Sequence, residues 1–376
     1  MTKLAGFEFT KYIKYNNSGE IIALRALNLR QGELDLTDIK RIDKSVSELL
    51  PRSKLYSGDI LLTYTGNGYG DCALISENDR YHLAPNICKI TPDIQKIDSY
   101  FLYSYIRSKA FYQQMSNHMV GSSQPTIPMR AIRELKVPFP SLEKQKKIKV
   151  ILSTLDGKIR INHAINDNLQ QQAKALYAEM FLGSSNDDVI SGTLSDIAVI
   201  TMGQSPSGSS YNEDGVGEVF YQGRAEFGFR FPKRRLFTTE PKRIAETGDV
   251  LLSVRAPVGD LNVAYERCCI GRGLGAIHSK TGHSSFVLYT MFALRSQLDV
   301  FNGEGTVFGS INRDALNAIP IDIPPVTEIN QFEAVAHPID ELIRANYEEN
   351  CRLEAIRDSL IPKLMSGEID VSAVQL

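Results

Sequence analysis

The sequence predicts an α+β protein: two similar mixed α/β domains separated by two long antiparallel coiled-coil helices, with pseudo-twofold symmetry. Three observations predict this fold. The chain repeats itself at an offset of 184 residues, since Pro140 matches Pro324 (324 − 140 = 184). Each copy begins with short strand patterns and ends with apolar residues in a 4-3-4-3 spacing, which is typical of one face of a helix. In both copies the same two positions of that face are asparagine.

The repeat divides the chain into four parts. Residues 1–142 form a first domain, 143–183 a central long helix, 184–326 a second domain, and 327–376 a distal long helix with a C-terminal tail. In each domain a Gly-Asp turn precedes a short apolar run, so we expect buried strands within 58–63 and 248–253. Further strands are expected at 72–76, 87–90, 198–202, 262–265 and 275–278, and short helices at 99–115 and 284–298.

Proline marks an extended exit strand at the end of each domain, 135–140 and 319–324, because proline is tolerated at strand ends and disfavours helix. The expected helix N-caps are Ser141 and Thr327, and the expected C-terminal stops are Gly183 and Gly367. Pro338 lies inside the second helical pattern, which predicts that this helix kinks or begins late.

The two helices are expected to pair with each other. Residues 143–182 carry 7 Lys/Arg and 4 Asp/Glu (+3), whereas residues 327–365 carry 4 and 8 (−4). Antiparallel packing places Asn162 and Asn166 opposite Asn350 and Asn346, and a buried asparagine layer fixes register at some cost in stability. The alternative is that these asparagines face solvent. The predicted seam consists of Leu155, Ile159, Asn162, Asn166, Leu169, Ile343, Asn346, Asn350 and Leu353.

Composition limits the class of protein. Hydrophobic residues make up 43% and charged residues 23%, which is ordinary for a globular protein. We expect no membrane segment, because no stretch reaches the ~18 apolar residues of a membrane helix. The start of the chain lacks an apolar secretory signal, and the five cysteines include no CxxC pair, so a reducing cytoplasm is expected.

A search for catalytic motifs predicts no active site. The chain has no GxxxxGK[ST] phosphate loop, and residues 66–70 (Gly-Asn-Gly-Tyr-Gly) are better interpreted as a tight turn than as a nucleotide loop. Cys268, Cys269, His278 and His283 do not have the spacing of a common zinc site. We therefore expect neither catalysis, nor a metal, nor a cofactor bound by this chain.

Nucleic-acid signals are stronger. Residues 227–237 interleave aromatic and basic side chains, and residues 230–243 contain six Lys/Arg and one acidic residue. Clustered positive charge is typical of phosphate binding, and arginine also reads guanine. The alternative is a solvated hairpin with its aromatic rings in the core. A looser basic cluster lies between 40 and 54, and the polar loops 121–124 and 203–208 offer donors and acceptors for base edges.

These residues resemble a known family, the specificity (S) subunits of type I restriction-modification enzymes. The resemblance covers nearly the whole chain. In the first half it rests on Gly121-Ser-Ser-Gln-Pro-Thr-Ile127, Leu135-Lys-Val-Pro-Phe-Pro140 and Glu143-Lys-Gln145. In the second half it rests on Val254-Arg-Ala-Pro-Val-Gly-Asp260, Cys269-Ile-Gly-Arg-Gly273, Gly305-Thr-Val-Phe-Gly-Ser-Ile311, Ile319-Pro-Ile-Asp-Ile-Pro324, Glu328-Ile-Asn-Gln331 and the tail from Arg357 to Ile369. Gln124 has no glutamine counterpart in the second half, so no shared role is expected of those loops.

The resemblance implies two target recognition domains that each read one half of a split site in double-stranded DNA. It implies that the long helices set the spacing of the halves and dock two methyltransferase (M) subunits, which bring S-adenosylmethionine and methylate adenine. Motor-nuclease (R) subunits complete the restriction form, and the isolated chain is expected to self-associate through exposed apolar helix faces. Two other readings stay open: a non-enzymatic protein-interaction adaptor with a coiled-coil spacer, and a nuclease with a degenerate site.

The predicted DNA-contacting residues share a positive charge or a polar side chain. They are Lys40, Arg41, Lys44, Arg52, Lys54, Tyr64, Asn67, Ser123 and Gln124 in the first domain, and Arg230, Lys233, Arg234, Arg235, Arg255 and Arg272 in the second.

Overall fold

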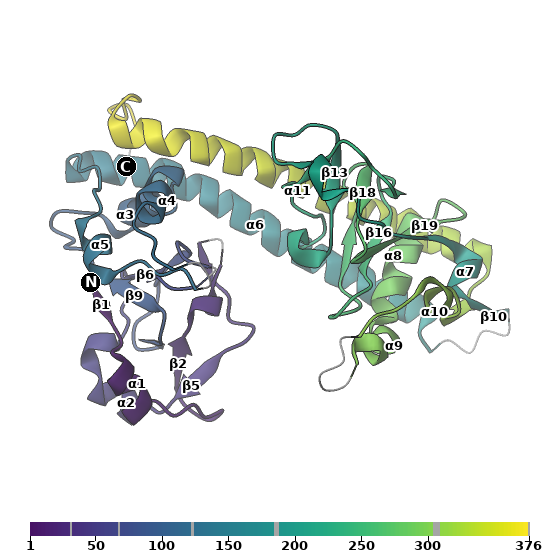
Figure 1. The fold of residues 1–376 in the computed structure, drawn as a ribbon, viewed down its shortest axis with the longest axis horizontal. Coiled ribbons are helices and arrows are strands. Elements are labelled where there is room, and N and C mark those ends of the chain that lie inside the picture. The colour runs from purple at the N-terminus through teal and green to yellow at the C-terminus, as the bar shows by residue number, and fades with distance from the viewer. Residues whose placement is uncertain (31, 67, 122–123, 184–187, 304–308, 375–376) are drawn as a thin grey trace. The chain divides into compact units, whose positions relative to one another are not determined.

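The structure is a computed structural model that describes residues 1–30, 32–66, 68–121, 124–183, 188–303 and 309–374. The chain forms two compact units, residues 1–162 with 348–376 and residues 163–347. The boundary between the units therefore crosses both long helices near their middle. The division expected from the sequence instead placed each long helix apart from the domains. Each unit contains one mixed α/β domain and half of each helix (Figure 1).

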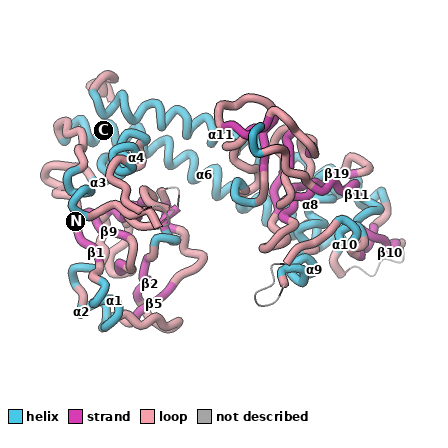
Figure 2. The backbone as a smooth tube through the Cα atoms, in the orientation of Figure 1, coloured by secondary structure: helices cyan, strands magenta, loops and turns pink. Residues whose placement is uncertain are grey.

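The first unit contains three small sheets, shown in magenta in Figure 2. A four-stranded sheet has the order β1-β9-β6-β7, a three-stranded sheet has the order β5-β2-β8, and β3 pairs with β4. The strands are β1 (Thr2–Lys3), β2 (Ile21–Leu24), β3 (Leu29–Arg30), β4 (Glu33–Leu34), β5 (Lys40–Ile42), β6 (Ile60–Thr63), β7 (Cys72–Leu74), β8 (Tyr81–Leu83) and β9 (Ile87–Ile90). The helices are α1 (Gly6–Tyr12), α2 (Lys44–Leu49), α3 (Ser99–Ile106), α4 (Lys109–Ser116), α5 (Met129–Glu134) and the 3-10 turns η1 (Ala26–Asn28) and η2 (Pro51–Ser53).

The second unit repeats the four-stranded sheet with the order β11-β19-β16-β17 and adds a five-stranded sheet with the order β12-β14-β13-β18-β15. Its strands are β10 (Ile190–Thr193), β11 (Ala198–Met202), β12 (Tyr211–Asn212), β13 (Glu218–Tyr221), β14 (Phe237–Thr238), β15 (Ile244–Ala245), β16 (Val250–Ser253), β17 (Leu261–Val263), β18 (Cys268–Ile270), β19 (Leu274–Ser279) and β20 (Pro320–Ile323). Its helices are α7 (Leu194–Ile197), α8 (Ser284–Ala293), α9 (Arg295–Asp299), α10 (Arg313–Asn317) and the 3-10 turns η3 (Gly208–Ser210), η4 (Arg224–Glu226) and η5 (Val300–Asn302).

The repeated Gly-Asp turn explains why β6 and β16 begin where they do. Gly58 and Gly248 have φ values of +91° and +89°, a region that glycine occupies without steric cost. The following carboxylate closes the turn: Asp59 accepts from the Tyr56 amide at 2.9 Å, and Asp249 accepts from the Glu246 amide at 2.8 Å. The strands predicted after these turns are confirmed, and all four residues of each are buried.

Two predicted segments differ from the structure. The expected helix over 99–115 is broken into α3 and α4, because the Ser108 hydroxyl caps a new helix by accepting from the Phe111 amide at 3.2 Å. The helix over 284–298 is likewise divided into α8 and α9. The predicted exit strand over 135–140 is wrong, since none of these residues belongs to a strand, whereas the second exit segment forms β20 and pairs with β10.

The long helices are α6 (Leu142–Phe181) and α11 (Val326–Ser366). Ser141 caps α6 as predicted, with its hydroxyl 3.4 Å from the Lys144 amide. Thr327 was predicted to cap α11, which is wrong because that helix has already begun at Val326. The predicted late start at Pro338 is also wrong, because α11 continues through this residue. Proline has no amide hydrogen, so the Ala334 carbonyl one turn earlier lacks its helical hydrogen bond. Both residues are exposed to solvent.

Each half of the helix pair completes the core of one domain. In the first unit Ile148 and Leu152 of α6 join Leu364 of α11 and the residues of α3 and β6 in one apolar cluster. In the second unit Tyr177 of α6 and Phe332 of α11 lie in the cluster that contains β16 and α8, with ring centroids 5.5 Å apart. Each domain therefore shares its hydrophobic core with the long helices.

A half-buried aspartate joins the helices to each domain at equivalent positions of the repeat (340 − 156 = 184). In the first unit Asp156 accepts from Arg107 at 3.0 Å, from Arg357 at 2.9 Å and from the Tyr100 hydroxyl at 2.5 Å. Burial raises the pKa of Asp156, but Arg107 and its other donors outweigh burial, so this pKa lies below its usual value. The charged form is held at neutral pH.

In the second unit the equivalent Asp340 accepts from Arg230 at 2.6 Å and from the Tyr289 hydroxyl at 2.9 Å. The guanidinium of Arg230 also donates to Gln170 of α6 at 3.0 Å. These contacts connect a loop of the domain, α8 and both long helices. We call Asp156 and Asp340, each with its own donors, the aspartate joints.

The asparagines lie in the helix seam, and the helices run antiparallel within each unit. In the first unit the Asn162 side-chain amide donates to Asn350 at 2.8 Å and to Glu349 at 2.7 Å. In the second unit the Asn346 side-chain amide donates to Asn166 at 2.8 Å. Ile159, Asn162, Asn166, Ile343 and Asn350 are buried, and Leu155, Leu169, Asn346 and Leu353 are half-buried. The pairing expected from the repeat is present, and the solvent-facing alternative is excluded for Asn162, Asn166 and Asn350.

Replacing both Asn162 and Asn350 with leucine should raise the free energy of unfolding by about 1 kcal/mol. The side-chain oxygen of Asn162 and the side-chain nitrogen of Asn350 are buried without a hydrogen-bond partner, so the double change removes two unsatisfied groups. The single change Asn162→Leu is the matched control and should destabilise, because it leaves the Asn350 amide buried alone. Urea unfolding measures both variants; a double variant less stable than the native chain would contradict the prediction.

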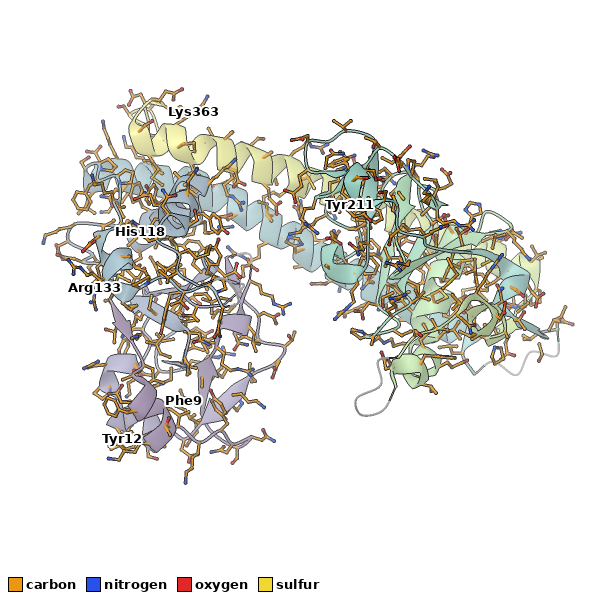
Figure 3. All side chains as sticks on the ribbon, in the orientation of Figure 1. Phe9, Tyr12, His118, Arg133, Tyr211 and Lys363 are labelled. Carbon is orange, nitrogen blue, oxygen red and sulfur yellow. The ribbon has the colours of Figure 1, made fainter. Side chains whose placement is uncertain are left out.

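His82 predicts a pH dependence of stability. Its ring is fully buried in β8, its Nδ1 lies 2.8 Å from the Leu83 carbonyl, and burial lowers its pKa below the usual 6.5. The unfolded chain then binds a proton that the folded chain does not, so stability is retained above about pH 6.5 and falls on acidification, by up to about 1.4 kcal/mol per pH unit. The change His82→Gln should remove this slope. The control is His118→Gln, at the exposed His118 labelled in Figure 3, and an unchanged slope in His82→Gln would refute the assignment.

Candidate nucleic-acid interface

Four loops of the second unit meet where the strands of its two larger sheets end. They contain residues 203–207, 222–224, 254–260 and 271–273. Backbone hydrogen bonds hold them together: the Gly203 amide donates to Leu274 at 2.9 Å, the Gly273 amide to Gln222 at 3.1 Å, and the Val254 amide to Gly273 at 3.0 Å. Glycine is required for this packing, since a Cβ on Gly203 would lie 2.1 Å from the Gly271 carbonyl oxygen.

Four exposed side chains of these loops form what we call the second loop surface: Gln204, Gln222, Arg255 and Arg272. The backbone of Arg255 forms an antiparallel β-bridge with Ser310. The Arg272 backbone amide donates to the Ser205 hydroxyl at 3.3 Å. Within the described residues neither guanidinium has an acidic partner. The neighbouring Arg224 and Arg295 differ, because both bind Asp260. The surface therefore presents two unpaired cations and two amides.

The first unit builds the same backbone frame. The Tyr64 amide donates to Asn86 at 3.1 Å, as Val254 does to Gly273 in the second unit. The Ile127 amide donates to Tyr64 at 2.9 Å and the Gly66 amide to Pro125 at 2.8 Å, matching Ile311 to Val254 at 3.1 Å and Ala256 to Gly309 at 3.0 Å. A bridge between Thr65 and Thr126 matches the bridge between Arg255 and Ser310.

On the same frame, at neighbouring rather than identical positions, four side chains of the first unit form what we call the first loop surface: Lys3, Tyr64, Asn86 and Gln124. Asn86 and Gln124 are exposed, and Asn86 turns the chain between β8 and β9 with a φ of +71°. The Lys3 ammonium lies 5.6 Å from the centroid of the Tyr64 ring, within the range of a cation–π contact. Arg25 lies where the second unit has Gln222, but its guanidinium is bound to Asp38 at 3.1 Å.

Three of the six cations in the predicted basic cluster of the second domain, Arg230, Arg234 and Arg235, are neutralised by ion pairs. Arg230 was predicted to contact DNA, which is wrong on the geometry, because its side chain is 4% exposed and paired with Asp340 in an aspartate joint. Arg234 binds Glu266, and Arg235 binds Glu226 at 2.6 Å. Lys233 remains exposed. The aromatic rings follow the alternative interpretation in part, since Phe231 is buried whereas Phe229 is exposed.

The predicted residues of the first domain divide into two groups. Tyr64 and Gln124 belong to the first loop surface, while Asn67 and Ser123 lie outside the described residues. The other five lie on β5, α2, η2 and the residue after η2. Lys40, Lys44 and Arg52 are exposed; Arg41 and Lys54 are half-buried, with Arg41 donating to the Gly19 carbonyl at 3.3 Å. No side-chain hydrogen bond or ion pair among the described residues joins this group to the first loop surface, although η2, which contains Arg52, packs beside β1, which contains Lys3.

Lys3, Asn86 and Gln222 were not predicted from the sequence. Their place depends on backbone bonds between segments far apart in the chain, which no local pattern reveals. The one available signal was the pair Gly271 and Gly273, because closely spaced glycines after a strand indicate a close approach of two backbones.

Other kinds of site find no support among the described residues. No group of three or more His, Cys, Asp or Glu side chains there is placed to hold a metal ion. Cys268 and Cys269 are buried in β18, while His278 lies beside Asp249 at 2.6 Å.

A separate test concerns membranes: none of the described helices is long and apolar enough to cross one.

The fold defines a duplicated α+β protein whose two domains carry matching loop surfaces and are built onto antiparallel helices. Comparison with known proteins identifies its family. The model of the type I restriction modification DNA specificity domain matches residues 6–171 and again residues 186–349. The chain therefore belongs to the family of type I restriction-modification specificity subunits.

The chain is also similar to individual specificity subunits. The putative type I restriction enzyme MjaX specificity subunit of Methanocaldococcus jannaschii is 30% identical over 371 residues, covering 92% of this chain and 87% of the relative. The MjaIX specificity subunit of the same organism is 20% identical over 304 residues, covering 73% and 69%. The type I S subunit from M. genitalium has a similar fold, with a TM-score of 0.51, 16% identity, and coverage of 96% and 91%.

Proposed function

We propose that this chain is the DNA-reading subunit of a type I restriction-modification complex, in which each domain reads one half of a bipartite site. The observation that carries the proposal is the duplicated loop surface: the same backbone frame presents exposed polar side chains in both units. Bases are read by such side chains in the grooves, whereas phosphate contacts position the protein. A duplicated frame on a duplicated domain suits two half-sites.

The long helices are proposed to set the spacing of the half-sites and to dock two adenine methyltransferase subunits. Exposed apolar residues on both helices support docking: Val150 (37%) and Ile356 (47%) in the first unit, and Val335 (51%) and Leu342 (47%) in the second. Exposed apolar faces indicate interaction surfaces. Within this proposal the chain itself is non-catalytic, S-adenosylmethionine is bound by the methyltransferase subunits, and motor-nuclease subunits join the restriction form.

The test is to map N6-methyladenine across the genome of a host that lacks adenine methylation. The chain is expressed there together with the methyltransferase subunit of its own organism, and the control strain expresses the methyltransferase alone. We expect methylation in a two-part motif only when both are present. Identical methylation without this chain would overturn the proposal.

A second measurement addresses the protein-interaction adaptor. The purified complex should bind duplex DNA with a logarithmic affinity that falls linearly with the logarithm of salt concentration. An adaptor whose domains bind protein predicts no such salt-dependent affinity.

A further inference from the structure

We propose that the two domains read half-sites of different chemistry: Arg255 and Arg272 of the second domain contact guanine, whereas Asn86 and Gln124 of the first domain contact adenine. This inference rests on the proposed function, since it names the bases that the two loop surfaces read. It also transfers the DNA-facing role in the first domain from the cluster between Lys40 and Lys54 to the first loop surface.

The location follows from the shared backbone frame. Each unit forms matching bonds from the strand end to the returning loop, from Thr63 to Asp71 and from Ser253 to Asp260, both at 2.8 Å between amide nitrogen and carbonyl oxygen. With the bonds through Tyr64 and Val254 described above, these fix the same loops at the same edge of the repeated sheet. A duplicated protein that binds a duplicated ligand is expected to use the same edge in both copies. The cluster between Lys40 and Lys54 lies on β5, α2, η2 and the residue after η2, outside these loops.

The second loop surface has the chemistry of guanine recognition. An arginine fork donates two hydrogen bonds to O6 and N7 of guanine, which is the commonest specific contact in the major groove. Arg255 and Arg272 are exposed and have no acidic partner among the described residues, whereas Arg224, Arg234, Arg235 and Arg267 are each bound to a carboxylate. Of this set, only Arg255 and Arg272 lie on the loop surface without a competing charge.

The first loop surface lacks such a fork. Its loops at 64–71, 85–86 and 120–126 contain no arginine, and the adjacent Arg25 is held by Asp38, with its Nη2 also 2.7 Å from the Asp38 carbonyl. Among the described residues of these loops, the exposed base-reading groups are the amides of Asn86 and Gln124, and amides pair with N6 and N7 of adenine. Lys3, held over the Tyr64 ring, supplies positive charge for the DNA backbone.

The experiment uses the complete complex with its methyltransferase and the same genome-wide map of N6-methyladenine. Arg255→Gln with Arg272→Gln should relax the preference for guanine in one half of the motif, by about ten-fold or more at each position, and leave the other half unchanged. Asn86→Ala with Gln124→Ala should relax an adenine position in the other half only. Lys40→Ala with Lys44→Ala tests the rival location and should leave the motif unchanged.

Arg255→Lys with Arg272→Lys is the charge-preserving variant. It should relax the guanine positions while the salt dependence of DNA binding stays native, because lysine keeps the charge and loses the fork. Co-purification with the methyltransferase verifies assembly of every variant. A uniform loss of methylation with an unchanged motif in the Gln variants would overturn the base assignment in favour of phosphate contact, and a motif altered by the Lys40 and Lys44 changes would overturn the location.

These failures are distinct from failure of the proposed function. If the native chain directs a two-part motif and none of the loop variants alters it, the inference fails and the proposed function stands. If the native motif does not depend on the chain, the proposed function fails.

Discussion

Replacing Asp340 with alanine should lower the free energy of unfolding of residues 163–347 by about 3–5 kcal/mol. Arg230 is 4% exposed and carries a full charge, since the Asp340 carboxylate and the Tyr289 hydroxyl overcome the effect of burial and raise its pKa. Removing Asp340 leaves this charge buried, and the partners that remain to it in the described part of the chain are Gln170 and the Tyr289 hydroxyl. An uncompensated buried charge costs far more than the lost attraction of an exposed pair.

The matched control is Glu341→Ala, the next residue of α11, which is exposed and forms no ion pair among the described residues. It should change stability by less than about 0.5 kcal/mol. Hydrogen exchange read peptide by peptide measures the loss within residues 163–347 separately from the other unit. Equal losses in the two variants would contradict the assignment of Asp340 as a joint. The double change Asp340→Leu with Arg230→Met should recover much of the loss, because it removes both charges.

The parts of the fold that the sequence predicted are those that depend on local pattern or on the repeat. Glycine followed by aspartate predicts a turn wherever it occurs, so β6 and β16 were found in both domains. The asparagine pairs followed from the repeat together with opposite helix charges, and the structure pairs Asn162 with Asn350. The break between α3 and α4 had a visible signal in Ser108, whose capping role competes with continuation of the helix.

Arg230 shows what local pattern does not reveal. Its segment alternates aromatic and basic residues, which indicates phosphate binding as well as core packing. The direction of each side chain depends on partners distant in the chain: Asp340 for Arg230, and Glu266 for Arg234. Charge counted along the sequence therefore overestimated the free positive charge of this domain. The loop surfaces were hidden for a related reason, since Asn86 and Gln222 take their place from backbone bonds to Tyr64 and Gly273.

Gly203→Ala should disrupt the second loop surface and lower the stability of its unit by about 1–3 kcal/mol. A Cβ at residue 203 would lie 2.1 Å from the Gly271 carbonyl oxygen and 2.8 Å from that of Leu274. Both neighbours are backbone atoms, so the loops themselves must move apart. Because Gln204 and Arg272 flank the two facing glycines, the separation displaces the side chains proposed to read the second half-site.

The consequence for function is selective. In the complete complex, Gly203→Ala should relax one half of the methylated motif and retain the other, because the first unit does not contain this contact. The control is Gly208→Ala in η3, where an added Cβ meets no atom within 4 Å and the motif should stay native. Methylation mapping reports specificity, and thermal unfolding of the same preparations reports stability. A Gly203→Ala protein that is destabilised yet keeps both halves of its motif would show that the spacing of these loops does not set specificity, and that the second half-site is read elsewhere on the domain.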